Sequence, residues 1–295
     1  MHDICVIGHI TQEVVRIGGQ PDRYMLGGAA HYSGVALARL GLDTAVLTKT
    51  APADAASVLL PMREAGVTAY ARDGGHTTYF ENTYPRDDLD QRTQRVVAVA
   101  DPFAPADLEG VSAKAIHLGP LTPGEMPVTF LAAVSQLGVR VSLDVQGFVR
   151  ATNNGTIEAG PWDEAQQGLY YVDIVKADIA EARVLTGRRD PDEAARAIAA
   201  MGPSEVILTD GSAGSRILAQ GRFHQIPAYP PSPALDPTGC GDTYMAGYLF
   251  SRGQSGDVER AGRFGAALAA LKLQHNGPAD ASEEEVRELL RALAD

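Results

Sequence analysis

The segment Leu235-Asp236-Pro237-Thr238-Gly239-Cys240-Gly241-Asp242-Thr243 joins a glycine-rich turn to a carboxylate, just before an apolar run that begins at Tyr244. Backbone N–H groups at the start of a helix are unpaired donors at the positive end of the helix dipole, so they attract anionic oxygens. A carboxylate beside them repels phosphate, but it can take a proton from an attacking hydroxyl. The pattern favours phosphoryl transfer with Asp242 as the base, and the alternative is a plain capped turn.

Composition limits the partners that such a site can serve. The chain has 295 residues with 45% hydrophobic content and a formal net charge of −12. This length suits one large α/β domain or two small ones, and the negative charge argues against a nucleic acid partner. No apolar run approaches the roughly 20 residues that span a bilayer. The N-terminus leads directly into Ile4-Cys5-Val6-Ile7 without a basic leader, so we expect a cytoplasmic protein with no membrane partner.

Cysteine and histidine give little sign of metal binding. The two cysteines, Cys5 and Cys240, cannot build a disulfide framework or a cysteine-rich metal site. The seven histidines show no ligand spacing such as His-x-x-x-His. Cys240 lies near an expected helix N-terminus, which lowers the pKa of a thiol, so we expect it to react with alkylating agents.

Short apolar runs alternate with alanine-rich helical stretches along most of the chain, which is typical of a parallel sheet with crossover helices. The expected strands are Asp3 to Gly8, Thr44 to Thr48, Ala115 to Leu118, Val139 to Val145, Ile174 to Lys176 and Val206 to Thr209. The expected helices are Ala29 to Leu40, Ala53 to Ala65, Glu125 to Leu137, Ile179 to Leu185 and Asp192 to Met201. The predicted fold class is therefore α/β, a doubly wound, mostly parallel sheet sandwiched by helices, in a single domain over residues 1–295.

Two regions, about 10–26 and 69–100, break this alternation. They are rich in β-branched and aromatic residues without helical spacing, around a turn at Gly18-Gly19-Gln20-Pro21. We expect a small extra sheet that acts as a lid over the carboxyl ends of the strands and excludes water. The alternative is a pair of surface hairpins with no such role. The apolar Val15, Ile17 and Met25 would give the lid a surface for pairing two chains.

Four segments, in this order along the chain, resemble the ribokinase-like (PfkB) family of carbohydrate kinases. They are Leu26-Gly27-Gly28-Ala29-Ala30 with Arg39-Leu40-Gly41, Lys176-Ala177-Asp178-Ile179-Ala180-Glu181, Thr209-Asp210-Gly211-Ser212-Ala213-Gly214, and Asp236 to Asp242. The resemblance covers the whole chain and implies a ribokinase-like fold. It also implies an ATP-dependent kinase that phosphorylates a hydroxyl of a small molecule.

The resemblance assigns roles to residues of each segment. In the last segment, Gly239, Cys240 and Gly241 would form the anion hole and Asp242 would be the base. Glu181 would act through water on the Mg²⁺ that accompanies the phosphates, beside Asp178, which replaces the family's usual Asn. Thr209, Gly211 and Gly214 would lie along the nucleotide, and Gly27 and Gly28 would let a sugar approach the backbone. Some members also use K⁺, which here would lie near Asp236 and the Thr238 carbonyl.

The acceptor end departs from the family's common pattern. Glu13 stands five residues after Gly8, where the family commonly has Asp, and Tyr32 replaces the usual Asn. Leu143-Asp144-Val145-Gln146-Gly147-Phe148-Val149-Arg150 resembles a stretch of the inositol 3-kinase branch, so Gln146 and Arg150 would donate hydrogen bonds to ring hydroxyls. The expected acceptor is thus a small sugar or cyclic polyol such as myo-inositol.

Two other functions remain open at this stage. A nucleoside kinase of the same family would place base-stacking aromatics such as Tyr79, Phe80 or Phe148 against the pocket. A sugar-sensing protein would keep the kinase fold without the catalytic activity. The intact Asp242 and glycine turn argue against this alternative, since a protein without catalytic activity needs no base.

Overall fold

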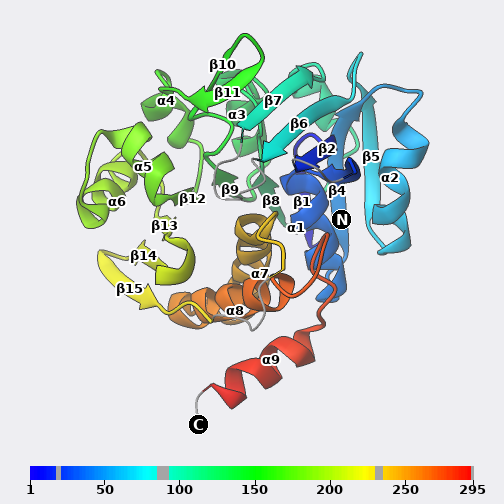
Figure 1. The fold of residues 1–295 in the computed structure, drawn as a ribbon. Coiled ribbons are helices and arrows are strands. Elements are labelled where there is room, and N and C mark those ends of the chain that lie inside the picture. Colours follow the sequence, from blue (N-terminus) through cyan, green and yellow to red (C-terminus); the bar gives the residue numbers. More distant parts are fainter. Residues whose placement is uncertain (18–20, 85–92, 230–234, 294–295) are drawn as a thin grey trace.

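The central element of the molecule is a nine-stranded sheet of order β15-β14-β13-β12-β9-β8-β1-β4-β5 (Figure 1). The computed structural model describes residues 1–17, 21–84, 93–229 and 235–293, so the expected turn at 18–20 and the parts of the expected lid at 18–20 and 85–92 lie outside it. The strands that run parallel are β1 Ile4–Ile7, β4 Thr44–Thr50, β5 Thr68–Asp73, β8 Ala115–Leu118, β9 Arg140–Asp144, β12 Ile174–Asp178 and β13 Glu205–Thr209. The edge hairpin of β14 Ser215–Ala219 and β15 Arg222–Ile226 is antiparallel.

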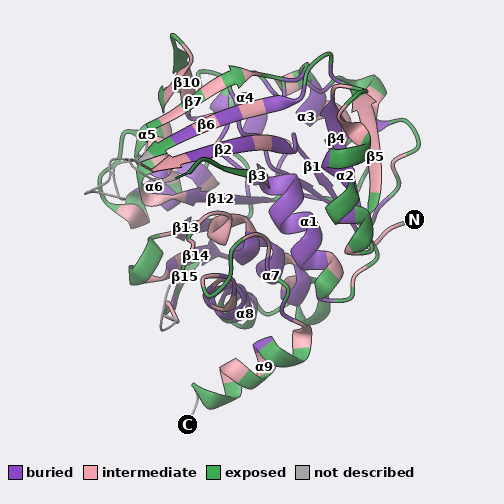
Figure 2. Ribbon diagram, turned by 45° about the vertical axis from the view of Figure 1, so that its right-hand side comes forward, coloured by how far each residue is buried: buried purple, intermediate pink, exposed green. Residues whose placement is uncertain are grey.

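Helices cover both faces of this sheet because successive strand residues point to opposite sides. Ile4 and Val6 of β1 pack with α1, α2, α7 and α8, whereas Cys5 and Ile7 pack in the core that contains α3, α5 and α6. The helices of the first face are α1 Ala29–Arg39, α2 Ala55–Glu64, α7 Cys240–Ser255 and α8 Val258–Lys272, followed by the outlying α9 Glu283–Ala292. Those of the second are α3 Val128–Ser135, α4 Ala165–Leu169, α5 Ile179–Thr186 and α6 Pro191–Ala199, with short 3₁₀ turns at Pro105–Leu108 and Gly211–Ala213. Figure 2 shows α1 and α8 buried over most of their length.

The α/β fold class and all six predicted strands are confirmed. The edge hairpin β14–β15 is an addition that the sequence analysis missed. The helix expected from Glu125 begins at Val128, because Pro127 is its N-cap and disfavours helical backbone at the residue before it. The Glu125 carboxylate accepts hydrogen bonds from the N–H groups of His9 and Leu121. Among the described residues, no helix combines the length and the apolarity that crossing a bilayer requires.

A second sheet of six strands lies at one end of the first, in the order β10-β11-β7-β6-β2-β3. Its strands are β2 Thr11–Ile17, β3 Arg23–Gly27, β6 Thr78–Tyr84, β7 Thr93–Ala98, β10 Arg150–Asn153 and β11 Thr156–Ala159. The predicted membership of this sheet was wrong in two places. β5 belongs to the main sheet, where it pairs in parallel with β4, and the hairpin at 150–159 belongs to the second sheet.

The chain order of the main sheet reverses between β1 and β8. From β1 the chain adds β4 and β5 on one side, and it then returns to β8 and builds outward on the other side. In open α/β sheets such a reversal leaves a crevice at the carboxyl ends of the strands, where ligands bind. The crevice here is framed by the loops after β1, β8, β9, β12 and β13, and α7 begins beside it.

Candidate active site

A cavity of about 310 Å³ lies at this crevice and contains most of the predicted site residues. It is lined by Glu13, Gly28, Tyr32, Phe80, Gln94, Leu121, Asp144, Gln146, Arg150, Lys176, Asp178, Glu181, Thr209, Pro237, Thr238, Gly239, Gly241 and Asp242. Residues from β2, β6 and β7 of the second sheet thus share one cavity with the turn before α7. The structure brings together the expected acceptor end at Glu13 and the expected anion-binding end at Asp242, which lie far apart in the sequence.

At the acceptor end, the Glu13 carboxylate is held in a fixed orientation. The Thr11 hydroxyl donates to Oε1 at 2.7 Å and the Asn82 amide donates to Oε2 at 2.8 Å. Gly27 packs so closely that a Cβ atom there would lie 2.0 Å from Glu13 Oε1, so only glycine fits. A carboxylate fixed by two neutral donors still has lone pairs for the hydroxyls of a substrate. Asn82 was not predicted, since its distance in sequence from Glu13 hides the contact across the β2–β6 pair.

At the anion-binding end, Gly239 has a left-handed backbone conformation with φ of 75° and caps α7. A Cβ atom at Gly239 would lie 2.2 Å from the Tyr32 ring, so glycine is required there for space as well as for conformation. Among the described residues, no partner is found for the N–H groups of Gly239, Gly241 and Asp242, whereas Cys240 N donates to the Pro237 carbonyl at 3.1 Å. The amides of Gly239, Gly241 and Asp242 are thus available for an anion at the helix start, whereas the Cys240 amide, which was also expected to take part, is already bonded.

The surroundings of Cys240 argue against the expected reactivity of its thiol. Its Sγ lies 4.0 Å from the carbonyl oxygens of Asp236 and Ala269, and the residue does not line the cavity. Burial raises the pKa of the Cys240 thiol to about 11, with Lys272 opposing the shift and Asp236 adding to it. The expectation from the helix N-terminus fails because the Cys240 side chain lies near the carbonyl oxygens of Asp236 and Ala269 instead of near the amides.

We therefore expect Cys240 to remain unmodified when the folded protein is treated with iodoacetamide near neutral pH, since little thiolate is present well below the pKa. Peptide mass spectrometry after the reaction checks this. Carbamidomethylation of Cys240 in folded protein at a rate near that of the unfolded chain would contradict it.

Asp242 has the electrostatic character of a general base. Burial raises the pKa of its carboxyl group to about 7. The negative charge of Asp144 adds to the rise, while the positive charges of Lys176 and Arg150 oppose it. The backbone carbonyl of Asp242 accepts a hydrogen bond from Ser33 Oγ at 3.0 Å, which ties the start of α7 to α1. A base with a pKa near the working pH is the most effective at accepting a proton during reaction.

Two buried charges of the cavity were not predicted as site residues. Lys176 and Asp144 form an ion pair with 2.7 Å between Nζ and Oδ2, at the carboxyl ends of the neighbouring strands β12 and β9. Both lie in segments that resemble the family, Lys176 in residues 176–181 and Asp144 in residues 143–150. The sequence therefore contained the pattern from which both could have been predicted as site residues. Tyr32, which stands where the family usually has Asn, also lines the cavity. It is buried, and among the described residues its hydroxyl has no hydrogen-bond partner.

The residues expected on the donor side lie next to one another. Asp178 caps α5 by accepting from Glu181 N at 2.7 Å, and Glu181 Oε2 accepts in return from Asp178 N at 2.7 Å. Burial raises the pKa of Glu181, partly offset by Lys176. Asp178 pairs with Thr209 across β12 and β13, and a groove of about 790 Å³ continues from both residues along Arg183 and Gly211.

Gly211 and Gly214 both have positive φ, of 49° and 93°, in the loop after β13. A Cβ atom at Gly214 would lie 2.2 Å from the Ile226 carbonyl oxygen, which requires glycine. Gly211 lines the groove, whereas Gly214 does not line it and instead lets the loop pack closely against Ile226.

The residues present suit Mg²⁺ held mainly by phosphate and water. In the described part of the chain, no group of three or more His, Cys, Asp or Glu side chains is placed to hold a metal ion. Mg²⁺ commonly takes one or two carboxylates and completes its shell with water and substrate phosphates. The carboxylates of Asp178 and Glu181 in the cavity fit that limited role, with Glu181 keeping one oxygen outside the capping box.

Of the two residues expected to hold a monovalent cation, Asp236 and Thr238, the first has its oxygens bound by a lysine side chain. Lys272 is 0% exposed, and its Nζ lies 2.7 Å from the Asp236 carbonyl oxygen and 3.3 Å from Asp236 Oδ2. Burial alone would raise the pKa of Asp236, but hydrogen bonds from Thr238 and the charge of Lys272 hold it below its usual range. Lys272, which closes α8, thus supplies a positive charge beside the glycine turn.

Gln146 and Arg150, the other residues expected to contact the acceptor, both line the cavity. Arg150 Nη1 donates to the Leu121 carbonyl at 2.9 Å. Of the aromatics considered for a nucleoside base, Phe80 lines the cavity, whereas Phe148 stacks on Trp162 with 3.9 Å between ring centroids. Neither Phe148 nor Tyr79 lines the cavity.

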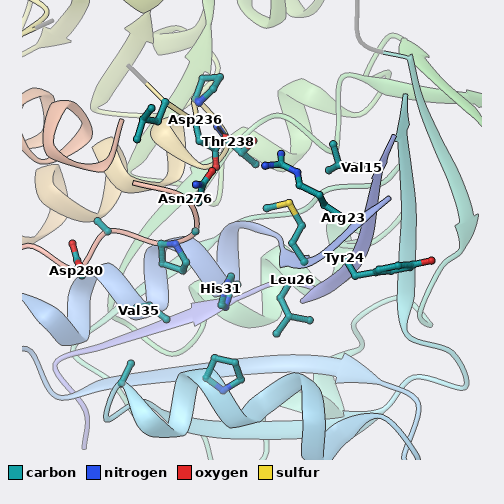
Figure 3. A pocket seen from close by; sticks show the side chains of 18 of the residues that line it. Val15, Arg23, Tyr24, Leu26, His31, Val35, Asp236, Thr238, Asn276 and Asp280 are labelled. Atoms are coloured by element: carbon teal, nitrogen blue, oxygen red, sulfur yellow. Dashed lines mark hydrogen bonds between the residues drawn. The ribbon is translucent and has the colours of Figure 1, made fainter. Parts of the chain in front are cut away.

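A larger cavity, of about 1020 Å³, lies on the other side of the Asp236–Thr238 segment (Figure 3). Val15, Ile17 and Met25, the side chains considered for pairing two chains, line this cavity together with His31 and residues 276–280. Val15 is 7% exposed, so it is not an outward-facing apolar residue. The larger cavity lacks both Asp242 and the anion-binding amides, and we therefore place the chemistry in the smaller one.

The fold and the cavity together place a buried carboxylate and a helix start with unpaired amides at a topological reversal. The pfkB family carbohydrate kinase profile matches residues 1–285. The chain therefore belongs to the pfkB family, and the predicted ribokinase-like fold is confirmed.

Three relatives illustrate the range of the family around this chain. A cytidine kinase of Thermococcus kodakarensis is 28% identical over 285 residues, which cover 94% of this chain and 98% of the relative. An inositol 3-kinase of Oryza sativa subsp. japonica is 27% identical over 267 residues, which cover 82% of this chain and 61% of the relative. A pyrophosphate-dependent kinase in the ribokinase family, solved with a pyrophosphate analog and myo-inositol, has a TM-score of 0.86, 30% identity and coverage of 98% of this chain and 99% of its own.

Proposed function

We propose that this kinase transfers the terminal phosphoryl group of a polyphosphate donor to a hydroxyl of a small cyclic polyol or sugar, with myo-inositol as the leading acceptor. The observation that carries the proposal is the small cavity that joins the fixed Glu13 carboxylate to Asp242 and the unpaired amides. A volume of about 310 Å³ lies at the lower end of the range for ligand sites. It suits one ring with a phosphoryl group better than a sugar with an attached base.

In the proposed mechanism, the acceptor lies between Glu13 and Asp242. Glu13 accepts hydrogen bonds from ring hydroxyls, and Gln146 and Arg150 donate to others. Asp242 takes the proton of the attacking hydroxyl while its oxygen bonds to phosphorus. The bond to the leaving oxygen of the donor breaks, and the amides of Gly239, Gly241 and Asp242 hold the transferred group. Mg²⁺, when bound beside Asp178 and Glu181, would neutralise phosphate charge.

We propose the second sheet as a lid within a single domain over residues 1–295. Glu13, Phe80 and Gln94 reach the cavity from β2, β6 and β7, so a movement of this sheet would open and close the acceptor end. Closure would exclude water, which otherwise competes with the acceptor for the phosphoryl group.

ATP is the donor that we expect, because the groove beyond Asp178 and Thr209 leaves room for a nucleotide along Gly211. Inorganic pyrophosphate is the second candidate, since the similar solved structure is that of a pyrophosphate-dependent kinase. The two donors share a terminal phosphoryl group in a pyrophosphate linkage. Release of ADP or of phosphate in parallel assays, each started with the acceptor, distinguishes them.

A nucleoside acceptor is the alternative, supported by the relative named cytidine kinase, which matches nearly the whole chain. The position of Phe80 in the cavity favours it, while the stacking of Phe148 on Trp162 does not. The purified protein should be assayed with both donors over polyols, sugars and nucleosides. We expect turnover with cyclic polyols. Turnover restricted to nucleosides would replace the proposal, and no turnover with every acceptor would favour a sensor.

The pH dependence of the reaction should report Asp242. A base is active when deprotonated, so kcat/KM should fall about tenfold for each pH unit below the pKa and level off above it. With the pKa of Asp242 raised to about 7, the bend should lie near neutral pH. Initial rates from about pH 5.5 to about pH 9 measure this, and a profile that stays flat down to the acid end would remove Asp242 from the role of base.

A further inference from the structure

Lys176 is a buried positive charge of the cavity that has no role in the proposed mechanism. It lies in β12 with 5% of its surface exposed, and its Nζ donates to Asp144 Oδ2 at 2.7 Å. A lysine is rarely buried to this extent, because removing an ammonium group from water costs several kcal/mol unless it is paired. Its placement on the cavity wall, and not in the apolar core, is the first indication of a role toward a ligand.

The position of the ammonium group relative to the glycine turn is the second indication. A Cβ atom at Gly241 would lie 2.9 Å from Lys176 Nζ and 3.5 Å from Cε. The ammonium group therefore lies directly against the turn whose amides are unpaired. A glycine at position 241 leaves open the space between the amides and the ammonium group, where any larger residue would displace the lysine.

The charges around Lys176 keep it protonated. Burial alone would lower its pKa, but the carboxylates of Asp144, Glu181 and Asp242 outweigh burial and hold the pKa above its usual range. An ammonium group has three N–H donors. Among the described residues, Asp144 is the only side-chain partner found for Lys176 Nζ, which leaves N–H groups for a ligand of the cavity. A phosphate oxygen would be the natural partner of its remaining donors.

We propose that Lys176 is a catalytic residue of this kinase, which binds the terminal phosphoryl group of the donor and stabilises the charge that develops on it during transfer. The proposal rests on the proposed function and extends it. Lys176 neither gains nor loses a proton in the step. The acceptor proton goes to Asp242, and the electron pair of the broken bond leaves with the donor's bridging oxygen. Charge that is fixed in advance in a water-poor site is the usual source of such stabilisation.

The competing explanation is that Lys176 only neutralises Asp144. Both roles predict that Lys176→Met alone impairs the protein, because it leaves Asp144 buried without its partner. They differ when both charges are removed. A structural counter-ion is not needed once Asp144 is neutral, whereas a phosphoryl-binding lysine is still missed. The informative comparison is therefore between Asp144→Asn and the double variant Asp144→Asn/Lys176→Met.

The test measures kcat with the preferred donor and acceptor, together with the thermal midpoint of each variant. We expect the double variant to match Asp144→Asn in thermal midpoint but to be slower by about 100-fold or more, as for loss of one transition-state donor. Equal turnover of the two variants, within about threefold, would overturn the proposal. Lys114→Met is the matched control, since Lys114 is an exposed lysine paired with Asp3 on the surface.

A second measurement keeps the inference testable apart from turnover. Calorimetric titration with inorganic pyrophosphate in the presence of Mg²⁺ probes the anion site without any acceptor. Asp144→Asn/Lys176→Met should bind pyrophosphate at least about tenfold more weakly than Asp144→Asn, and Lys114→Met should bind it as well as the native protein does. Equal affinity of Asp144→Asn and the double variant, or no binding by the native protein, would contradict the role of Lys176. If no acceptor is turned over but this difference is present, the acceptor assignment fails and the anion site stands.

Discussion

Asp242→Asn is expected to lower kcat by about 10² to 10⁴-fold while leaving the affinity for the donor nearly unchanged, because general-base catalysis contributes rate enhancements of that size. Asparagine keeps the shape of the side chain but cannot accept the proton of the attacking hydroxyl. The amides of the turn and the fixed Glu13 remain in place, so binding should persist. Steady-state kinetics and calorimetric titration with the donor measure the two effects separately.

The matched control for this variant is Asp190→Asn. Asp190 caps α6 through a 2.9 Å hydrogen bond from Glu193 N, and asparagine caps helices about as well as aspartate. Turnover of Asp190→Asn should equal that of the native protein. Near-native turnover in Asp242→Asn would remove the central residue of the mechanism.

Lys272→Met is expected to lower the free energy of unfolding by about 3 kcal/mol, the cost of breaking a buried ion pair by removing one partner. The lower end of the usual range applies because the Asp236 side chain keeps 13% exposure. The substitution leaves the Asp236 carboxylate and carbonyl without the ammonium group beside the glycine turn. Urea denaturation measures the loss, and the double variant Asp236→Asn/Lys272→Met should recover most of it. Equal stability of Lys272→Met and the native protein would contradict the role given to this contact.

The same contact bears on the cation requirement. Because Lys272 already places a positive charge 2.7 Å from the Asp236 carbonyl, a second cation there would be repelled. Turnover of the native enzyme should therefore be the same in potassium and in tetramethylammonium salts of equal ionic strength. Activation by K⁺ alone would show that the monovalent cation binds at another set of oxygens.

The strands of the main sheet that run parallel and are fully buried could be predicted from the sequence. Runs such as Ile4 to Ile7 are apolar on both faces of a buried parallel strand, and their hydrophobic pattern identifies them directly. The second sheet was only partly accessible. Thr68–Asp73 has the β-branched and aromatic character of the lid segments, and only its pairing with β4 assigns it to the main sheet. Propensity describes a strand but does not identify its neighbour.

The candidate site shows the same limit. Residues within one segment, such as Asp178 and Glu181, were identified because their spacing is local. Contacts between distant segments were not, and Asn82 on Glu13 and Lys272 on Asp236 are the main examples. Cys240 shows how a local rule fails, since the helix start that lowers a thiol pKa acts only if the side chain stays near the amides. Here the side chain lies near the carbonyl oxygens of Asp236 and Ala269, and burial raises the pKa of its thiol to about 11.

The most direct test of the proposed function is the identity of the phosphorylated product when acceptors compete. The native protein is incubated with equal concentrations of myo-inositol, ribose and cytidine, once with ATP and once with pyrophosphate, and the products are resolved by mass spectrometry and ³¹P NMR. The account predicts that an inositol monophosphate forms first with one of the donors and that Asp242→Asn forms none at a comparable rate. Preferential formation of a cytidine monophosphate would contradict it.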